Sequence, residues 1–202
     1  MRSTETSLIG FGTRGDQHVV LKVVRQENSE EWRCGEILRA FDGEGMIQVL
    51  ESANGAVLLP RLKPGHDLGS LCREGRDDDA TEILAAIIGR ISKVSSELTW
   101  IGSIERLQPD FARFRAGAAG FIPVPFVERA EALFAELSAT QREPRLLHGD
   151  LHHHNVLFDD TSGWVAIDPW GAIGEIEFEV GASLRNPVDA PHLLPQRLSS
   201  VA

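Results

Sequence analysis

The feature that constrains this chain most is a polar run near residue 150 that leads into two short apolar segments. The run reads His-Gly-Asp-Leu-His-His-His-Asn over residues 148–155, and the apolar segments cover residues 155–158 and 164–167. Short segments rich in aliphatic, β-branched and aromatic residues predict two strands. Asp150 and Asn155 then share one loop, five residues apart, and Asp168 directly follows the second strand. The pattern predicts a loop and a hairpin that present two carboxylates and one amide.

These three side chains suit the transfer of a phosphoryl group. Such a reaction needs one carboxylate to orient and deprotonate the attacking hydroxyl, and oxygen ligands that hold magnesium against the nucleotide phosphates. Asp150, Asn155 and Asp168 follow one another with the spacing of the catalytic aspartate, the metal-binding asparagine and the metal-binding aspartate of kinases. The residues themselves therefore favour a kinase.

Further stretches add a family resemblance. They are His148-Gly149-Asp150-Leu151-His152, Ile167-Asp168-Pro169, Gly174-Glu175, Glu179 and Leu184-Arg185-Asn186-Pro187, with a weaker likeness over Leu38-Arg39-Ala40-Phe41-Asp42-Gly43, Leu58-Leu59, Arg61-Leu62 and Pro64-Gly65. Through these motifs most of the chain resembles the aminoglycoside/hydroxyurea antibiotic resistance kinases. Within that family it is similar to the streptomycin 6-kinase and hydroxyurea phosphotransferase branch.

The resemblance implies a fold, cofactors and residue roles. The fold would be the two-lobed protein-kinase-like fold, and ATP and Mg²⁺ would be the cofactors. Asp150 would be the catalytic base, while Asn155 and Asp168 would bind Mg²⁺. The acceptor would be a hydroxyl group of a small molecule, either a streptomycin-like aminoglycoside or hydroxyurea, and its phosphorylation would give antibiotic resistance.

The charge balance fits a small cationic partner better than a nucleic acid. The 202 residues include 20 Lys and Arg against 30 Asp and Glu, a net charge of −10. Nucleic-acid binding needs a basic surface, so we expect no such partner. No apolar run approaches the roughly 20 residues of a membrane span, so we expect no membrane partner either. A polar start without a signal segment, and two cysteines far apart, predict a cytoplasmic protein.

Hydrophobic patterning predicts two lobes of an α+β protein. Residues 1–62 would form an N-terminal nucleotide-binding lobe with a small antiparallel sheet and one helix. Residues 63–202 would form a mainly helical catalytic and substrate-binding lobe. The expected strands of the first lobe cover residues 8–13, 18–24, 46–51 and 56–62, and its helix covers residues 30–41. The expected helices of the second lobe cover residues 81–98, 126–138 and 177–184.

Lys22 lies within an apolar strand, where a lysine needs either a partner or an exposed edge. In the kinase-like fold this lysine reaches the nucleotide phosphates and pairs with a helix glutamate. At 100° per residue, the buried face of the expected helix is defined by Cys34, Ile37, Leu38 and Phe41, and Glu31 lies close to that face. We predict Glu31 as the partner of Lys22. The alternative is an edge-strand Lys22 that points to solvent.

The segment that joins the lobes is expected to contact the nucleotide base. By the resemblance, Leu59 and Arg61 lie where backbone groups meet adenine, and we predict them as cofactor-binding residues. Pro60 between them lacks a backbone N–H, which leaves the choice between ATP and GTP open.

A Gly-x-Gly-x-x-Gly motif over residues 10–15 is interpreted as a strand and its turn. A kinase phosphate loop precedes the lysine by a strand, a turn and most of another strand. Only six residues separate Gly15 from Lys22. The phosphate loop would then lie around residues 3–7, and the first strand of the sheet would be missing.

The chain is therefore expected to be truncated at both ends relative to its family. A missing first strand leaves an unpaired sheet edge, which favours self-association. The tail after Pro187 is short and broken by prolines, so it would not form the helix pair that covers the substrate. The apolar face of the helix over residues 126–138 would then be exposed.

Two alternative functions remain open from the sequence. The chain is an inactive nucleotide-binding remnant if the missing strand is essential, or a metallohydrolase if the histidines beside Asp150 bind zinc. These histidines are His148, His152, His153 and His154. Three consecutive histidines on an extended segment cannot all face one metal. We therefore expect His148 and His152 to be hydrogen-bonded loop residues.

Overall fold

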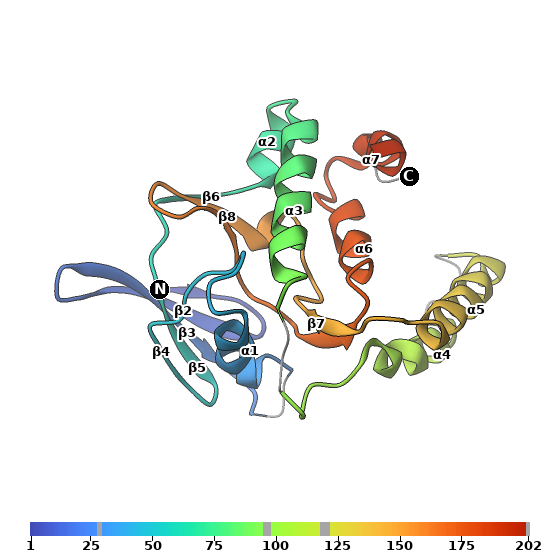
Figure 1. The fold of residues 1–202 in the computed structure, drawn as a ribbon, viewed down its shortest axis with the longest axis horizontal. Coiled ribbons are helices and arrows are strands. Elements are labelled where there is room, and N and C mark those ends of the chain that lie inside the picture. The colour runs from blue at the N-terminus through green and yellow to red at the C-terminus, as the bar shows by residue number, and fades with distance from the viewer. Residues whose placement is uncertain (28–29, 95–97, 118–121, 201–202) are drawn as a thin grey trace.

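The computed structural model describes residues 1–27, 30–94, 98–117 and 122–200. A sheet built from the first 60 residues lies on one side of the molecule, and the later helices gather on the other (Figure 1). One pair of helices projects at the far end from that sheet (Figure 1). This is the α+β architecture that the sequence predicts.

The sheet has five antiparallel strands in the order β1-β2-β3-β5-β4. Its strands are β1 (Arg2–Ser3), β2 (Ser7–Arg14), β3 (Gln17–Val24), β4 (Glu51–Ala53) and β5 (Ala56–Pro60). β3 lies between β2 and β5, and Lys22 pairs with Ile9 on one side and with Val57 on the other. Lys22 is only 7% exposed. The alternative of an edge-strand Lys22 that points to solvent is therefore wrong.

The glycine motif forms a strand and a turn, as predicted. Gly10 and Gly12 belong to β2, and Gly15 lies in the turn to β3 with a φ of 58°, which glycine adopts without steric cost. The first strand, which we expected to be missing, is present as the two-residue β1 and pairs with β2. Thr4 accepts the N–H of Ser7 in the turn between these two strands, over 2.9 Å.

The expected strand over residues 46–51 is wrong. Only its last residue belongs to a strand, the short β4. Met46 and Ile47 are buried, and they contact Ala166 in the later half of the chain. The Ile47 N–H donates to the Ala166 carbonyl, and the Ala166 N–H donates to the Gly45 carbonyl, each over 2.8 Å. This apolar segment joins the two halves of the chain and does not extend the sheet.

The predicted helix over residues 30–41 begins as the 3₁₀ helix η1 (Glu30–Arg33) and continues as α1 (Cys34–Phe41). The buried face of α1 contains the residues predicted for it: Cys34, Ile37, Leu38 and Phe41. Gly171 has a φ of 79°, and a Cβ there would lie 2.4 Å from Cδ1 of Ile37. Only glycine therefore lets α1 pack this closely against the loop that follows Asp168.

The later residues form two small sheets and most of the helices. One sheet has the order β6-β8-β9, and the other pairs β7 with β10. These strands are β6 (Pro64–Asp67), β7 (Arg145–Leu147), β8 (Val156–Asp159), β9 (Gly163–Ala166) and β10 (Ala172–Gly174). The helices are α2 (Gly69–Arg73), α3 (Asp77–Ile91), α4 (Gln108–Gly117), α5 (Val124–Ala139), α6 (Phe178–Leu184) and α7 (Leu194–Ser200). Within the described residues they are connected by the 3₁₀ helices η2 (Ile104–Leu107), η3 (His153–Asn155) and η4 (Pro191–Leu193).

Among the predicted helices, α3 differs most in its bounds from the prediction over residues 81–98. It begins at Asp77, four residues before residue 81. Asp77, Asp78 and Asp79 form its first turn, where carboxylates complement the positive end of the helix dipole. It ends at Ile91, and residues 95–97 of the predicted helix lie outside the described residues. α5 contains the helix predicted over residues 126–138, and α6 matches the helix predicted over residues 177–184.

The C-terminal tail contains η4 and the short helix α7, and a buried ion pair holds α7 against α3. Arg197 of α7 and Asp77 of α3 have side chains that are each 5% exposed, and Arg197 Nε donates to Asp77 Oδ2 over 2.9 Å. The same guanidinium donates to the Asn186 carbonyl. Pro191 begins η4 and Pro195 lies in the first turn of α7, and the ion pair of Arg197 folds this tail onto the molecule.

α4 and α5 pack against each other and leave an apolar groove of 510 Å³ open to solvent. Exposed apolar side chains along this pair and the turn before α5 include Phe114, Ile122, Val124, Phe126, Leu133 and Leu137. The expected exposed apolar face is therefore confirmed. Among the residues that the structure describes, no helix combines the length and the apolarity needed to cross a membrane.

The buried ion pair of α7 gives a first testable prediction. Arg197→Met leaves the buried Asp77 carboxylate without its cation, which costs about 3–5 kcal/mol of folding free energy. Urea denaturation followed by circular dichroism measures this change. The double variant Asp77→Leu/Arg197→Met should recover most of the loss, because no unpaired charge stays buried. Arg113→Met removes the exposed partner of Asp110 and serves as the control, with a much smaller effect. If Arg197→Met and Arg113→Met lowered the free energy of unfolding equally, the stabilising role given to the Arg197–Asp77 ion pair would be wrong.

Candidate active site

A cleft of 420 Å³ lies where the loop over residues 149–155, the loop after β9 and the segment of η1 meet. Its lining residues are Glu31, Leu107, Gly149, Asp150, His152, Asn155, Asp168, Pro169, Trp170, Phe178 and Arg185. The residues predicted as catalytic and metal-binding thus share one cleft with Glu31.

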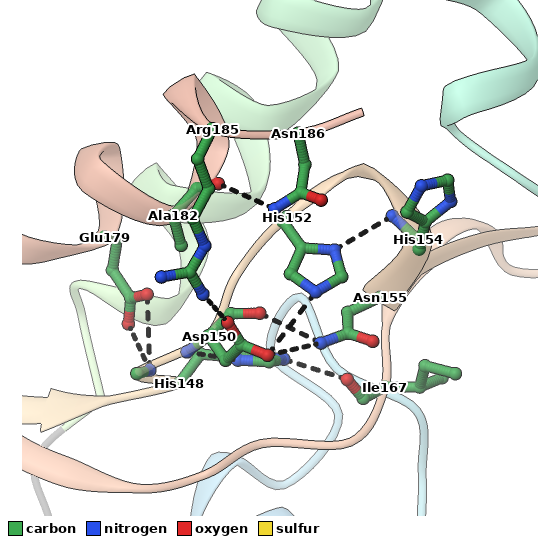
Figure 2. Close-up of polar contacts among 11 residues, drawn as sticks. His148, Asp150, His152, His154, Asn155, Ile167, Glu179, Ala182, Arg185 and Asn186 are labelled. Atoms are coloured by element: carbon green, nitrogen blue, oxygen red, sulfur yellow. Dashed lines mark hydrogen bonds and ion pairs between the residues drawn. The ribbon is translucent and has the colours of Figure 1, made fainter. Parts of the chain in front are cut away.

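His148 fixes the loop that carries Asp150. The imidazole is fully buried, its Nε2 donates to the Ile167 carbonyl over 2.9 Å, and its Nδ1 accepts the Asp150 N–H over 3.2 Å (Figure 2). Burial lowers the pKa of His148 to about 4, so the neutral ring can donate at one nitrogen and accept at the other. His148 is therefore a hydrogen-bonded loop residue, as expected, and it ties this loop to the residue before Asp168.

The Asp150 carboxylate has partners on both oxygens and is 35% exposed. Arg185 Nη2 donates to Oδ1, and His152 Nε2 lies 3.4 Å from Oδ2 (Figure 2). Burial acts to raise the pKa of Asp150, but His152 and Arg185 outweigh burial, and the pKa lies below its ordinary value. Asp150 is therefore ionised at neutral pH, as a general base must be.

Asn155 and Asp168 place further oxygen atoms beside Asp150. Asn155 Nδ2 donates to the Asp150 carbonyl over 2.9 Å, which leaves Oδ1 of the amide as the acceptor for a cation. Asp168 has a φ of 62°, which is uncommon for a residue with a side chain, and its carboxylate is 44% exposed. Carboxylate and amide oxygens are the ligands that Mg²⁺ prefers. The donor set therefore fits the ion that the sequence implies.

Lys22 connects these carboxylates to the sheet. Its Nζ lies 2.7 Å from Glu31 Oε2 and donates to Asp168 Oδ1. Burial acts to lower the pKa of Lys22, but Asp168 and Glu31 outweigh it, and the pKa is raised. Burial likewise acts to raise the pKa of Glu31, and Lys22 reverses this shift, so the pKa of Glu31 is lowered. Ser7 Oγ also donates to Glu31 Oε2 over 3.1 Å. The structure thus pairs Lys22 with Glu31.

The structure does not bring Leu59 and Arg61 into this cleft. Leu59 packs in the hydrophobic core and pairs with Val20 in the sheet. The Arg61 N–H donates to the His18 carbonyl over 3.0 Å, and its guanidinium lies 5.1 Å from the ring of Phe11. A contact of Leu59 or Arg61 with adenine stays a prediction, and the Arg61 N–H is already engaged.

The three consecutive histidines turn toward different neighbours. His152 faces Asp150, whereas His154 Nδ1 lies 3.1 Å from Asp67 Oδ2. His153 points into the interior, and neither of its ring nitrogens has a hydrogen-bond partner among the described residues. They therefore share no metal site at Asp150 within the described part of the chain.

His153 does approach Cys72 and Asp77, with ligand atoms all within 4.8 Å of one another. The guanidinium of Arg197 already neutralises Asp77 there, and it also donates to Cys72 Sγ over 3.4 Å. A cation that belongs to the protein therefore occupies the position beside Asp77. The zinc-based metallohydrolase alternative gains no support from this cluster.

Two polar residues near Asp150 were not assigned a role from the sequence. Arg185 pairs with the Asp150 side chain, and Glu179 accepts hydrogen bonds from the Gly149 N–H over 3.1 and 3.3 Å. Both residues come from α6 or its C-terminal end, about 30 residues after the loop. No local spacing rule connects them to Asp150. The motifs noted in the sequence contain both, but only the fold shows what they contact.

Fold and site together define a class of protein. A small antiparallel sheet with a buried lysine–glutamate pair lies against a mainly helical part that carries an Asp, an Asn and an Asp around one hairpin. These are the features of the protein-kinase-like phosphotransferases.

Comparison with known proteins gives the family. The pattern of the aminoglycoside/hydroxyurea antibiotic resistance kinases matches residues 2–202. The streptomycin 3''-kinase of Klebsiella pneumoniae is 36% identical over 189 residues, which cover 92% of this chain and 67% of the relative. The hydroxyurea phosphotransferase of Kitasatospora aureofaciens is 32% identical over 203 residues, and the match covers 88% of this chain and 56% of that relative. The chain belongs to the aminoglycoside/hydroxyurea antibiotic resistance kinase family.

A solved structure supports the same fold. A thermostable mutant of aminoglycoside phosphotransferase APH(4)-Ia, in a ternary complex with ADP and hygromycin B, matches with a TM-score of 0.61 at 16% identity. The match covers 90% of this chain and 69% of that one. The protein-kinase-like fold expected from the sequence is therefore confirmed. The chain spans between 56% and 67% of the lengths of the two relatives named above.

The unpartnered ring of His153 gives a second testable prediction. Burial lowers the pKa of His153 to about 4, from an ordinary value of 6.5. Between pH 6.5 and pH 4 the unfolded chain therefore binds a proton at this position that the folded chain excludes, and folding stability falls as the pH falls. His153→Leu removes this titration. The free energy of unfolding of His153→Leu, relative to that of the parent chain, should therefore rise as the pH falls from 6.5 to 4. The rise should be at most about 1.4 kcal/mol per pH unit. Urea denaturation at several pH values measures the difference, and a constant difference would contradict the prediction.

Proposed function

We propose that this chain carries the catalytic core of an ATP- and Mg²⁺-dependent phosphotransferase that phosphorylates a hydroxyl group of a streptomycin-like aminoglycoside. The observation that carries the proposal is the convergence of Asp150, Asn155 and Asp168 in one cleft, with the Lys22–Glu31 pair beside them. The family supports the reaction class, and the complex of a structural neighbour with ADP and an aminoglycoside supports both ligands.

Each residue has a role that its surroundings suit. Asp150, ionised and partly exposed, would orient the acceptor hydroxyl and take its proton. Asn155 Oδ1 and the Asp168 carboxylate would hold Mg²⁺, which neutralises charge on the nucleotide phosphates when it is bound. Lys22 would place a fixed positive charge beside the same phosphates. Glu31 keeps Lys22 in position because the two side chains form a direct ion pair.

The division of labour between the halves of the chain follows from these roles. We assign residues 1–62, which supply Lys22 and Glu31, to nucleotide binding, and residues 63–202, which supply the reacting groups, to catalysis and acceptor binding. A hydroxyl that approaches Asp150 competes with Arg185, whose side chain is 62% exposed. Acceptor binding is therefore expected to require that this ion pair opens.

The acidic character of the chain favours a cationic acceptor. The net charge is −10, and the cleft carries the carboxylates of Glu31, Asp150 and Asp168. A negative potential raises the local concentration of cations and loses strength as salt screens it. Hydroxyurea, the substrate in the name of one relative, carries no such charge. A KM that rises with ionic strength would indicate an aminoglycoside, and a salt-independent KM would indicate hydroxyurea.

Charge-neutralising variants of the two aspartates give the third testable prediction. Asp150→Asn removes the base and should lower the rate of phosphoryl transfer by about 10²–10⁴-fold, while the Kd for MgATP stays nearly unchanged. Asp168→Asn removes a charged metal ligand and should weaken both MgATP binding and transfer. Calorimetry measures the Kd, and mass spectrometry of streptomycin and hydroxyurea detects an added phosphoryl group.

Asp160→Asn is the matched control for these variants. Asp160 lies exposed in the turn between β8 and β9, outside the cleft. Its replacement by Asn changes the charge of the chain by the same amount as the two site variants do. It should change neither the Kd nor the rate. Equal loss of MgATP binding in Asp150→Asn and Asp168→Asn would overturn the division of roles. A parent chain that binds MgATP and phosphorylates no acceptor would favour the nucleotide-binding remnant.

A further inference from the structure

A pocket of 210 Å³ lies between α3, α6 and α7, on the helical side of the molecule (Figure 1). No residue that lines it also lines the cleft around Asp150. Its apolar walls come from two of these helices, and they consist of Leu84, Ala85, Ile88, Val180 and Leu184. Ala85 is exposed, so it marks the rim of the pocket.

His153 lines the buried side of this pocket. Its side chain has no exposed surface, and neither ring nitrogen has a hydrogen-bond partner among the described residues. A buried polar atom without a partner lowers the stability of the fold, and native proteins contain few of them. A neutral imidazole has one donor and one acceptor nitrogen. Whichever nitrogen faces the pocket, the ring therefore offers a hydrogen bond to a molecule that enters it.

The other polar groups of the pocket already bind groups of the protein. Thr81 Oγ1 donates to the Asp77 carbonyl over 3.0 Å, and Ser183 Oγ donates to the Val180 carbonyl over 2.7 Å. Arg197 forms its ion pair with Asp77, and the two side chains are each 5% exposed. The charge of the guanidinium is therefore neutralised within the protein. A pocket without net charge favours a neutral ligand over an ion, because an ion would lose its hydration without gaining a counter-charge.

The volume and the walls of the pocket set the kind of ligand further. An apolar cavity of about 150 Å³ is large enough to hold benzene. A pocket of 210 Å³ therefore accommodates one ring with a small substituent. Aliphatic walls stabilise such a ring because they remove it from water. A buried water molecule needs about two to four polar partners, and these walls supply none.

We propose that this pocket is a second ligand site, which binds a small neutral molecule with an apolar ring and one hydroxyl group, such as a phenol. The ring contacts the aliphatic walls, and the hydroxyl pairs with the imidazole of His153. A hydroxyl both donates and accepts, so it can pair with either nitrogen. The proposal does not depend on the phosphotransferase function proposed above.

The second site lies directly behind the cleft. His153 belongs to η3, which also contains Asn155, and Leu184 of α6 precedes Arg185. Asn155 and Arg185 line the cleft, whereas His153 and Leu184 line the pocket. A ligand in the pocket therefore contacts the same two elements that carry cleft residues, without entering the cleft.

Calorimetric titration with p-cresol and with toluene tests the site. The two probes share a ring and a methyl group, and only p-cresol has a hydroxyl. For the parent chain we expect saturable binding of p-cresol with a Kd on the order of 10⁻⁴ M. Toluene should bind at least about tenfold more weakly, because it leaves the imidazole of His153 without a partner.

Two variants locate the binding, and one control accompanies them. Ala85→Phe places a ring at the rim and should weaken p-cresol binding at least about tenfold, because the ring takes up room in the pocket. Ala86→Phe is the matched control, since Ala86 is the next residue of α3, is exposed and does not line the pocket. His153→Phe keeps a ring but removes both nitrogens, so it should abolish the preference for p-cresol over toluene. If His153→Phe does not fold, the two probes with Ala85→Phe and Ala86→Phe carry the test.

Three results would overturn the proposal. The first is no saturable binding of p-cresol to the parent chain. The second is equal affinity for p-cresol and toluene, which would remove the hydroxyl from the ligand class. The third is equal p-cresol binding by Ala85→Phe and Ala86→Phe, which would place the bound probe elsewhere. Each readout is a binding measurement, so failure of the phosphotransferase function would leave this test unaffected.

Discussion

The cleft depends on one buried cation, the ammonium group of Lys22. It lies in the central strand of the sheet, and it contacts Glu31 of the 3₁₀ segment before α1 and Asp168 of the loop after β9. β3, η1 and the loop that carries Asp168, 146 residues after Lys22, therefore meet at one charge. Because a buried ammonium group needs counter-charges, these contacts favour the orientation of the sheet that brings both carboxylates to Lys22. The backbone contact between Ile47 and Ala166 stabilises the same orientation.

In the function proposed above, the site separates the groups that would react from the groups that hold them. Asp150 and Asp168 are partly exposed, so a hydroxyl and a cation can reach them. The side chains that fix their loops, His148 and Glu179, have no exposed surface and bind backbone groups. Buried polar groups must be paired, and a paired group in a low-dielectric interior moves little. Burial thus keeps these anchors rigid, while partial exposure leaves the carboxylates of Asp150 and Asp168 accessible.

Much of the fold and part of the site could be predicted because the signals are local. The apolar strand around Lys22 and the helical spacing of Cys34 and Leu38 led to Glu31, and the structure pairs the two residues. The prediction of a strand over residues 46–51 was wrong. An apolar segment that packs against a distant hairpin has the same hydrophobic pattern as a strand. The sequence predicts correctly that Leu59 lies in a strand and that Arg61 lies near its end. It does not show that the Arg61 N–H is already hydrogen-bonded to His18, because that bond depends on the neighbouring strand.

The sequence by itself determined the order of the chemical groups: a lysine in a strand, then an Asp, an Asn and an Asp around a hairpin. That order needs only local spacing, because neighbours along the chain share a loop or a strand. The tertiary structure decided which residues approach this set from elsewhere, namely Arg185 at the Asp150 carboxylate, Glu179 at Gly149 and Arg197 at Asp77. Hydrophobic periodicity shows which face of a helix is buried. It does not show which polar group that face will meet, because this depends on how whole elements pack.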